Sequence, residues 1–519
     1  MTLSPTSPST HYDAIIIGSG FGGSMVAHQL LQGGLKVLML ERGDWVTRGN
    51  HNWHPSGTLD LTPHYTTETP YRILAGGQSE IMGPYSCVGG PSVFYGTVSM
   101  RFREQDFTPT SEIVTNSGAG WPYTYADLEP YYTQAETILQ IAGEPNSDPT
   151  EPPRSAPYTH PLNPLSQTSQ KIKQAAETLN LKPFRLPLAI NYQTTPQRAA
   201  CITCTTCDTF ACAIEAKNDL ATCVLPPLLQ KGLDLKANTV VTRLIQENQR
   251  IIAVECFDKQ QNQWVRYHSD YFILAAGTLA SPHLILASRL ENLNPAGDAI
   301  GHYLMRHCNG IVLGFFPQNP NPEQQFHKQL GIQDFYFGHP SINHPPGKLG
   351  SLQQLQTPPV GLVKAYLPQP LGQLLSPLVQ HLTGLLVMAE DQPQYENHVA
   401  INWENKDRFG LPQLLVTHHY TERDLAARQV LLEKAKQILR QAGAWFFYVH
   451  PIKTFSHAVG TIRMGENPQT APVDLNGKFR GIENLAVADG SFMPTSAGIN
   501  PSLTIAAHAL RVGEQILKR

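Results

Sequence analysis

Four cysteines stand close together in the stretch CITCTTCDTFAC, at Cys201, Cys204, Cys207 and Cys212, and thiolates at such short spacing could bind a metal or an iron–sulfur cluster. The spacing departs from the common patterns. Bacterial ferredoxins end their motif in C-x₃-C-P, whereas here the last gap is longer and Ala213 replaces the proline. Zinc sites use two cysteine pairs separated by a longer loop. We predict a metal-free structural loop without catalytic cysteines, with a cluster or a disulfide as alternatives.

Three glycines, Gly18, Gly20 and Gly23, have the spacing G-x-G-x-x-G directly after the apolar run YDAIII. A helix-like segment follows, and a second apolar run, KVLML, ends at Glu41. This order of strand, turn, helix, strand and acid predicts a dinucleotide site. Gly18 permits the tight turn, Gly20 lets backbone N–H groups approach a pyrophosphate, and Gly23 lets the helix pack on the strand. Glu41 can then accept hydrogen bonds from ribose hydroxyls.

Two further stretches are suited to approach the same cofactor. In CVGGPSVFYG, Gly89 and Gly90 permit close contact of the backbone with a ligand, and Ser92 follows them. The run YFILAAG predicts a strand that ends in small residues. Ser281 and Pro282 come shortly after it and predict the N-cap and the first residue of a helix.

The C-terminal region repeats this arrangement. The run LAVADG predicts a strand that closes on Asp489 and Gly490. A helix is expected after it, with Asn500 as its N-cap and Pro501 as its first residue. The N-terminus of that helix would carry a partial positive charge and favour an anionic group beside it.

These motifs together resemble the glucose–methanol–choline (GMC) oxidoreductase family, and the resemblance runs from Asp13 to the C-terminus. Its most specific part is the block that begins HAVGTIRMG and continues through VDLNGKFRGIENLAVADGSFMPTSAGINPSLT. The phrase WPYTYADLEPYY is similar to the sugar- and polyol-oxidising and cholesterol-oxidase-like branches of the family.

The resemblance implies FAD as the cofactor. The implied contacts are Gly18, Gly20, Gly23, Glu41, Gly89, Gly90, Ser92, the backbone of Val241 beside the adenine, Ala276, Asp489 and Gly490. Relatives often carry an Asn in the second glycine motif, or a His that is linked covalently to the flavin, where this chain has Phe94 and Tyr95. The resemblance therefore implies FAD that is bound without a covalent bond.

The oxidation of an alcohol removes a hydride and a hydroxyl proton, and the protein must take the proton. Imidazole suits this task, since its ordinary pKa of about 6.5 makes it a base near neutrality. The resemblance places His457, which opens HAVGT, in that role and makes Asn500 its partner, holding the substrate oxygen by a hydrogen bond. The adjacent pair His418 and His419 is predicted to be structural.

The predicted fold class is α/β: a Rossmann-type FAD-binding domain with a discontinuous α+β substrate domain built on an antiparallel sheet. The segments 398–404 and 413–420 alternate in polarity and predict that sheet as one wall of the substrate site, covered by a helix over 424–444. We expect 370–388 to be a core helix that leads into a strand, with an apolar lid as the alternative. The predicted boundaries are a disordered tail at 1–10, an FAD-binding domain at 11–101, 200–310 and 455–519, and substrate-binding and connecting parts at 102–199 and 311–454.

Composition limits the partners. The 519 residues carry 38 basic and 41 acidic side chains, which gives no electrostatic argument for nucleic acid or an anionic membrane. No signal peptide or transmembrane stretch is recognisable, and the cysteine pattern favours a reducing cytoplasm. We predict an FAD-dependent oxidoreductase that converts C–OH of an alcohol, sugar or sterol-like substrate to C=O, with oxygen, a quinone or a protein as electron acceptor. The alternatives are a redox-neutral flavoprotein lyase and a flavin subunit that relays electrons through a cysteine-bound cluster.

Overall fold

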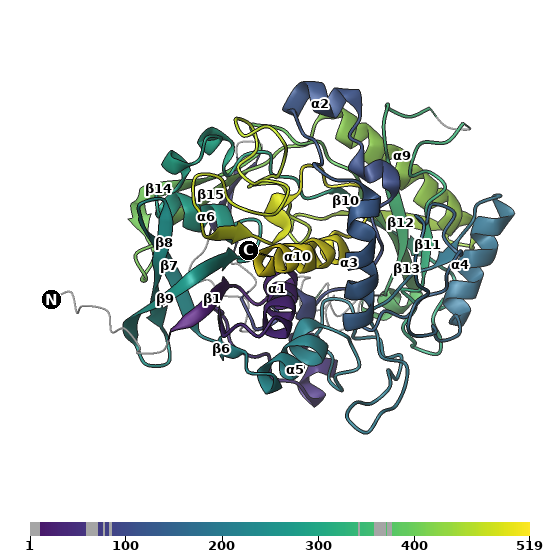
Figure 1. Cartoon of the computed structure of the whole chain (residues 1–519). Helices are drawn as coiled ribbons and strands as arrows, with labels where there is room; N and C mark the ends of the chain where they lie inside the picture. The colour runs from purple at the N-terminus through teal and green to yellow at the C-terminus, as the bar shows by residue number, and fades with distance from the viewer. Residues whose placement is uncertain are drawn as a thin grey trace.

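A computed structural model of the chain describes residues 11–58, 71–75, 78–82, 86–340, 343–357, 370 and 376–518. The predicted tail at 1–10 lies outside the described residues, as does part of the segment 370–388; within that segment, a short 3₁₀ helix at Ser376–His381 leads into a strand. Figure 1 shows three sheets with helices packed around them. The α-helices are α1 (Phe21–Gln32), α2 (Ser111–Ser117), α3 (Tyr125–Ile138), α4 (Gln167–Thr178), α5 (Leu225–Gln230), α6 (Ala280–Ala287), α9 (Glu422–Gln441) and α10 (Ser502–Leu517).

The first sheet has seven strands and forms the Rossmann-type half of the protein. Its strands are β1 (Tyr12–Ile17), β2 (Val37–Leu40), β6 (Asp234–Lys236), β7 (Thr239–Glu247), β8 (Arg250–Asp258), β9 (Gln263–Leu274) and β17 (Leu485–Val487). The pairs β6–β2, β2–β1, β1–β9 and β9–β17 are parallel, whereas β7, β8 and β9 form an antiparallel meander. Helix α1 packs against α10, and α10 packs against α3, beside the parallel strands (Figure 1). The predicted α/β class is confirmed.

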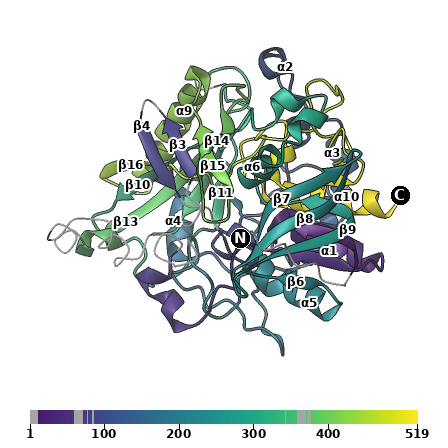
Figure 2. The ribbon, with the colours of Figure 1, turned by 90° about the vertical axis from the view of Figure 1, so that its left-hand side faces the viewer.

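The second sheet has six strands, and all of its pairs are antiparallel. Its order is β16 (Phe446–Pro451), β10 (Cys308–Phe315), β13 (Leu382–Ala389), β12 (Gly350–Leu355), β11 (Leu330–Ile332) and β5 (Phe184–Arg185). Helix α9 covers one face, where Leu431 and Leu432 share a core with Val312 and Leu385. An antiparallel sheet is thus present in the second half of the protein (Figure 2), although the segments 398–404 and 413–420, which predicted it, lie in another sheet.

The third sheet corrects one prediction. It contains β14 (His398–Lys406), β15 (Pro412–Thr417), β3 (Tyr71–Ala75) and β4 (Gln78–Met82). The predicted antiparallel pairing of β14 with β15 is confirmed, and β15 runs parallel to β3. The prediction that the helix over 424–444 covers this pair is wrong, because α9 packs on β10 and β13 of the six-stranded sheet instead. Alternation identified the strands but could not choose their sheet, since pairing partners are set by long-range contacts.

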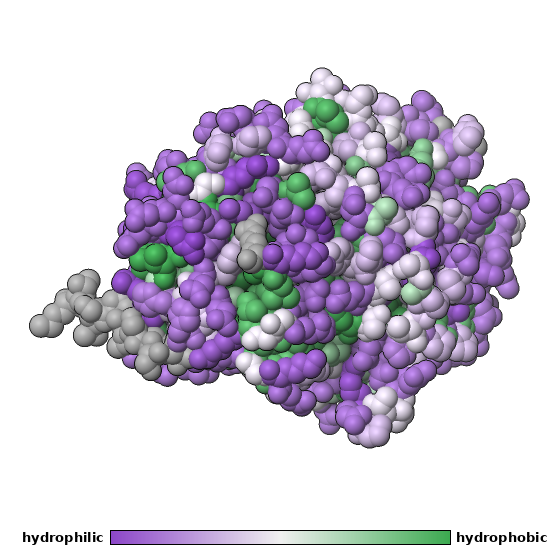
Figure 3. Space-filling view, in the orientation of Figure 1, coloured by the Kyte–Doolittle hydropathy of each residue, from purple (hydrophilic) through white to green (hydrophobic). Residues whose placement is uncertain are grey.

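The surface in Figure 3 is mainly polar, with a small hydrophobic area over the end of α10 and the neighbouring α1. The exposed Leu517 ends α10, and its side chain approaches Gly33, which follows α1. Among the described residues, no helix has both the length and the apolar character that crossing a lipid bilayer requires.

The core beside α10 contains a buried histidine. His508 is fully buried, stacks on Phe492 with ring centroids 3.6 Å apart, and has its Nδ1 3.1 Å from the hydroxyl oxygen of Tyr123. Burial, aided by the positive charge of Arg511, lowers the pKa of His508 to about 3. The folded protein therefore keeps this ring neutral at pH values where an unfolded histidine is protonated.

We expect His508→Phe to stabilise the protein, relative to the wild type, more at low pH than at high pH. The pKa of His508 is lower in the folded state than in the unfolded state. The contribution of His508 to the stability of the fold is therefore fully present above its unfolded pKa of about 6.5, and it is lost as the pH falls toward its folded pKa. The difference in the free energy of unfolding between the variant and the wild type should change by about 2 kcal/mol between about pH 8 and pH 5. The measurement is the free energy of chemical unfolding of both proteins at the two pH values. All other titrating groups are the same in both proteins. A difference in unfolding free energy that does not change with pH would therefore contradict the lowered pKa of His508.

Candidate cofactor and active site

The three glycines in the turn between β1 and α1 have different surroundings, and each is needed there for a different reason. Gly18 has φ +102°, and a Cβ there would lie 2.3 Å from the carbonyl oxygen of Ala275. A Cβ on Gly23 would lie 2.0 Å from the carbonyl oxygen of Gly18. A Cβ on Gly20 would meet nothing within 4 Å, because this position faces open space. Gly18 and Gly23 are thus required by the fold, whereas Gly20 keeps room beside the first turn of α1, where an anion is favoured.

Glu41 follows β2 and is buried beside this turn. Its carboxylate accepts hydrogen bonds from the backbone N–H and the hydroxyl of Ser19, at 3.1 and 2.6 Å, and from the N–H of Gly43 at 2.8 Å. Burial raises the pKa of Glu41, and these donors oppose the rise. Ser19 Oγ in turn accepts from the N–H of Gly89 at 2.9 Å, so Glu41 connects the first glycine motif to the second.

The second glycine motif packs against the first. Gly89 and Gly90 both have positive φ, and a Cβ on Gly89 would lie 2.9 Å from the backbone nitrogen of Ala221. Ser92 Oγ donates to the carbonyl of Gly89 at 2.7 Å and accepts from Leu220 N–H at 3.1 Å. Its hydroxyl therefore shapes the loop. Tyr95 Oη donates away from the motif, to the carbonyl of Asn218 at 2.9 Å.

Asp489 closes the carboxyl ends of β9 and β17. Its buried carboxylate accepts from the N–H of Gly277 and of Ser491, both at 2.9 Å, and from the hydroxyl of Ser281. The prediction that Ser281 and Pro282 begin a helix is wrong, because α6 begins at Ala280 and Ser281 uses its hydroxyl for Asp489. Burial raises the pKa of Asp489, and its four donors, which include the hydroxyl of Ser491, oppose the rise.

The side chain of Asn500 does not make the helix-capping contact predicted for it. Helix α10 begins at Ser502 after Pro501, and Asn500 does not cap it. Asn500 Oδ1 accepts instead from Nε2 of Gln353 on β12, at 2.8 Å. The helix-cap prediction is therefore wrong, because a contact across the two halves of the protein replaces the local one. With Oδ1 held by Gln353, the NH₂ group of Asn500 remains for other partners.

One cavity of about 820 Å³ brings the predicted site residues together, within the range of about 300–1,000 Å³ that ligand sites occupy. His457 and Asn500 both line it, although they come from different segments of the chain. Gly23 and Gly89 do not line it. The other predicted cofactor residues line it: Gly18, Gly20, Glu41, Gly90, Ser92, Val241, Ala276, Asp489 and Gly490. The open space at Gly20 and the donors around it suit a dinucleotide.

The side chain of His457 lines the cavity, and its imidazole ring is neutral. Its Nδ1 lies 3.1 Å from Nδ1 of His307, and the two rings are nearly perpendicular at 82°. Burial lowers the pKa of His457 to about 3, and the positive charge of Lys328 adds to the effect. At neutral pH the ring is therefore a proton acceptor and not an acid.

The sequence reasoning missed four polar residues of the site. Lys328 lines the cavity and donates to Asp208 at 2.6 Å, and Asn309 on β10 lines it nearby. Asn309 Oδ1 and Gln353 Oε1 are buried and have no hydrogen-bond partner among the described residues. Buried polar atoms are almost always paired, so these two indicate a ligand or water. Asp208 lies within the cysteine motif, but no motif marks Lys328, Asn309 and Gln353, which come from the second sheet and from a loop.

The cysteine-rich loop lies next to the main cavity. Cys201, Cys204, Cys207 and Cys212 line a separate cavity of about 20 Å³. Burial raises the pKa of the Cys201 thiol to about 12, which makes it a poor nucleophile. That these cysteines are not catalytic, and whether they bind a metal, stay predictions. The loop does contribute Asp208 to the main cavity.

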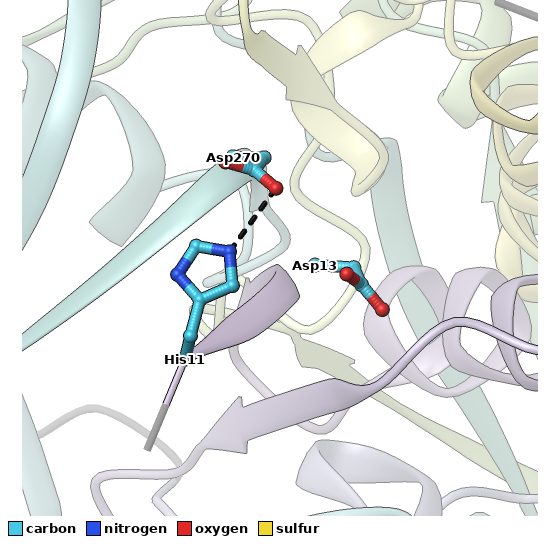
Figure 4. Close-up of side chains that lie close together, drawn as sticks. All are labelled: His11, Asp13 and Asp270. Carbon is cyan, nitrogen blue, oxygen red and sulfur yellow. Dashed lines mark hydrogen bonds and ion pairs between the residues drawn. The ribbon is translucent and has the colours of Figure 1, made fainter. Parts of the chain in front are cut away.

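A group at the amino end of β1, away from the glycine turn, contains possible metal ligands. Within the described residues, His11, Asp13 and Asp270 bring such atoms within 4.8 Å of one another, and His11 Nε2 is 3.1 Å from Asp270 (Figure 4). His11 and Asp270 are exposed, and Asp13 already accepts the N–H of Lys36 at 2.6 Å. Exposed carboxylates of this kind are common without a metal.

Comparisons with known proteins cover nearly the whole chain. Two GMC oxidoreductase sequence models match it, over residues 12–309 and 393–509. The chain is 28% identical to 6'''-hydroxyparomomycin C oxidase of Streptomyces lividus, covering 99% of this chain and 93% of that protein. It is 28% identical to paromamine 6'-oxidase of Streptomyces fradiae, with 97% and 91% covered, and 26% identical to the fructose dehydrogenase large subunit of Gluconobacter japonicus, with 97% of each covered.

Solved structures show the same fold. Pyridoxine 4-oxidase from Mesorbium loti superimposes with a TM-score of 0.68 at 18% identity, covering 98% of this chain and 99% of that one. A variant of formate oxidase from Aspergillus oryzae superimposes with a TM-score of 0.70 at 14% identity, covering 98% of both. The arrangement of a Rossmann-type half and an antiparallel substrate-side sheet is thus shared with these enzymes.

Two glycine variants should separate cofactor binding from folding. Gly20→Ala places its methyl group in open space, so the fold should be retained while FAD content falls. Gly23→Ala forces a methyl group against Gly18, so the protein should lose several kcal/mol of stability. The measurements are the melting temperature without added cofactor and the flavin released by acid precipitation. Equal losses of stability in the two variants would contradict a cofactor role for Gly20 and a folding role for Gly23.

Proposed function

Because this chain belongs to the GMC oxidoreductase family and is an FAD-dependent oxidoreductase acting on CH–OH groups, we propose that His457 is the base that takes the hydroxyl proton of its substrate. One observation carries the proposal: His457 and Asn500 line the same cavity as the glycine motifs and Asp489. A proton acceptor, a hydrogen-bond donor and a cofactor cradle in one cavity are the groups that alcohol oxidation requires.

The cofactor would be held by the chain's own backbone and carboxylates. The open turn at Gly20 leaves room for a pyrophosphate, Glu41 would bind a ribose, and Val241 would face the adenine. Neither Phe94 nor Tyr95 can provide an imidazole for a covalent link to the flavin. When bound, FAD supplies the acceptor for the hydride that leaves the C–H bond.

His457 and Asn500 divide the work at the substrate oxygen. The ring of His457 is neutral, so it can accept the hydroxyl proton as the carbonyl forms. Asn500 is held through Oδ1 by Gln353, and its NH₂ group is left to donate to the substrate oxygen. Gln353 thereby orients Asn500 from the second sheet.

Polar groups in the lining support a polyhydroxylated substrate. The ion pair of Lys328 with Asp208 and the unpaired Oδ1 of Asn309 offer donors and acceptors on one wall. The relatives' names include paromamine, fructose and 2-methyl-1,2-propanediol, all of which carry several polar groups or a small hydroxylated skeleton. We propose a sugar-like or polyol-like alcohol as the substrate class.

The electron acceptor and the location complete the proposal. The relatives are named both as oxidases and as dehydrogenases, so oxygen, a quinone and a protein are the acceptors to compare after reduction by substrate. We propose a cytoplasmic location, since all eight cysteines lie in described residues and none is paired in a disulfide.

Two variants test the division of roles. His457→Ala should slow flavin reduction by roughly 10²–10⁴-fold, the usual worth of a general base, and Asn500→Ala should slow it less. Both proteins should keep their FAD. Stopped-flow bleaching of the flavin under anaerobic conditions measures the rate. An unchanged rate in the His457 variant would remove this residue from the reaction.

A substrate screen tests the proposed class. Sugars and polyols should bleach the flavin at lower concentrations than long-chain alcohols or sterols. Asn309→Leu should weaken the apparent binding of the best polyol by about 10-fold, since a substrate hydroxyl loses its buried partner. FAD content serves as the control for the variant. Reduction of the flavin by a sterol at lower concentration than by any polyol would reject the polyol class, but it would still agree with the proposed oxidation of an alcohol.

A further inference from the structure

A second histidine lies directly behind the proposed base. His307 is buried just before β10, and its two ring nitrogens have different partners. Its Nδ1 lies 3.1 Å from Nδ1 of His457, and its Nε2 lies 3.0 Å from the backbone carbonyl oxygen of Ser496. The proposed function gives His307 no role, yet these two contacts determine where the protons of both rings lie.

The protons can be placed one after the other. A carbonyl oxygen only accepts hydrogen bonds, so Nε2 of His307 carries a proton and donates it to Ser496. Burial lowers the pKa of His307, so the ring holds a single proton and its Nδ1 is a bare acceptor. The short contact to His457 is a hydrogen bond only if Nδ1 of His457 carries the donated proton.

This arrangement leaves Nε2 of His457 without a proton. The ring is neutral, since burial lowers its pKa to about 3, and its one proton is on Nδ1. Nε2 makes no hydrogen bond to any described residue, and the side chain lines the main cavity. The nitrogen with the free lone pair is therefore the one that is left for a substrate hydroxyl.

We propose that His307 is a positioning residue that holds His457 in the tautomer with an unprotonated Nε2, ready to accept the substrate's hydroxyl proton. This inference rests on the proposed role of His457 as base. When Nε2 gains the proton, His457 becomes an imidazolium whose Nδ1–H still donates to the neutral His307. No proton needs to leave His307 during the step.

The backbone around His307 is built to hold this ring. His307 has φ +62°, in the left-handed region that histidine enters more readily than most residues. Asp391 accepts the N–H of His307 at 3.0 Å and that of Arg306 at 2.7 Å, and Tyr420 Oη donates to the carbonyl of His307 at 2.8 Å. His418 Nε2 lies 3.6 Å from Asp391, so the predicted structural histidine belongs to this support.

A spectroscopic measurement tests the tautomer without any turnover. In holoenzyme labelled with ¹⁵N-histidine, the resonances of His457 are those missing from His457→Ala. We expect Nδ1 to be of the protonated type and Nε2 of the unprotonated type near neutral pH. The opposite assignment would overturn the proposal. Because no substrate is present, this result is independent of whether His457 acts as the base.

Two amide variants separate the contact to His457 from the contact to Ser496. His307→Asn can place its amide oxygen where Nδ1 stood, and Asn tolerates the left-handed backbone. His307→Gln reaches the position of Nε2 and can still donate to Ser496, but it lacks the acceptor for His457. We expect flavin reduction to stay within about 3-fold of wild type in the Asn variant and to slow by about 10-fold in the Gln variant, the worth of one hydrogen bond.

The order of the two variants decides the outcome. Both should contain FAD at the wild-type level, and a slow Gln variant should show mixed tautomers of His457 in its ¹⁵N spectrum. If His307 acted only as an anchor to Ser496, the Gln variant would be the faster one. A faster Gln variant, or equal rates in the two variants, would overturn the proposal.

Discussion

Three parallel strands end at the same edge of the first sheet, and the whole site depends on this convergence. β1 pairs with β9, and β9 pairs with β17, so Gly18, Ala276 and Asp489 emerge side by side from distant parts of the chain. Ligands of open α/β sheets bind at the carboxyl ends of such strands. The Asp489 carboxylate fixes the edge, because it holds the loop after β9 and the turn after β17 at once.

The second half of the site comes from a close approach between the C-terminal loop and β12. A Cβ on Gly498 would lie 2.5 Å from Cα of Gly350, so neither backbone could come this near if a side chain stood there. Ser351 Oγ donates to the carbonyl of Gly498 at 2.8 Å, and Tyr336 Oη accepts its N–H at 2.9 Å. This docking carries Asn500 to the boundary between the two sheets. The cavity is thus lined by residues of both halves, with His457, Asp489 and the glycine motifs on one side and Asn309 on the other.

Burial gives the site its electrostatic character. In a region of low dielectric, an unpaired charge is costly, so buried charged groups need partners. The ammonium of Lys217 shows this, since it donates to the carbonyls of Cys207 and Phe210 at 2.7 Å and of Tyr95 at 3.1 Å. It thereby binds the cysteine-rich loop to the second glycine motif. The same desolvation keeps His457 neutral, and the neutral ring is the form that can accept a proton.

The sequence determined the features whose cause is local. The glycine spacing, the apolar run before it and Glu41 after β2 predicted the turn, because φ at Gly18 and the room at Gly20 are properties of a few neighbouring residues. His457 and Asn500 came from the resemblance to the family, and both line the cavity. The tertiary structure decided what depends on distant partners. Gln353 takes the side chain of Asn500 away from the helix cap, and Asp489 takes that of Ser281. His307, Lys328 and Asn309 belong to no motif. Only the packing of the second sheet against the first brings Lys328 and Asn309 to the cavity and His307 to the ring of His457.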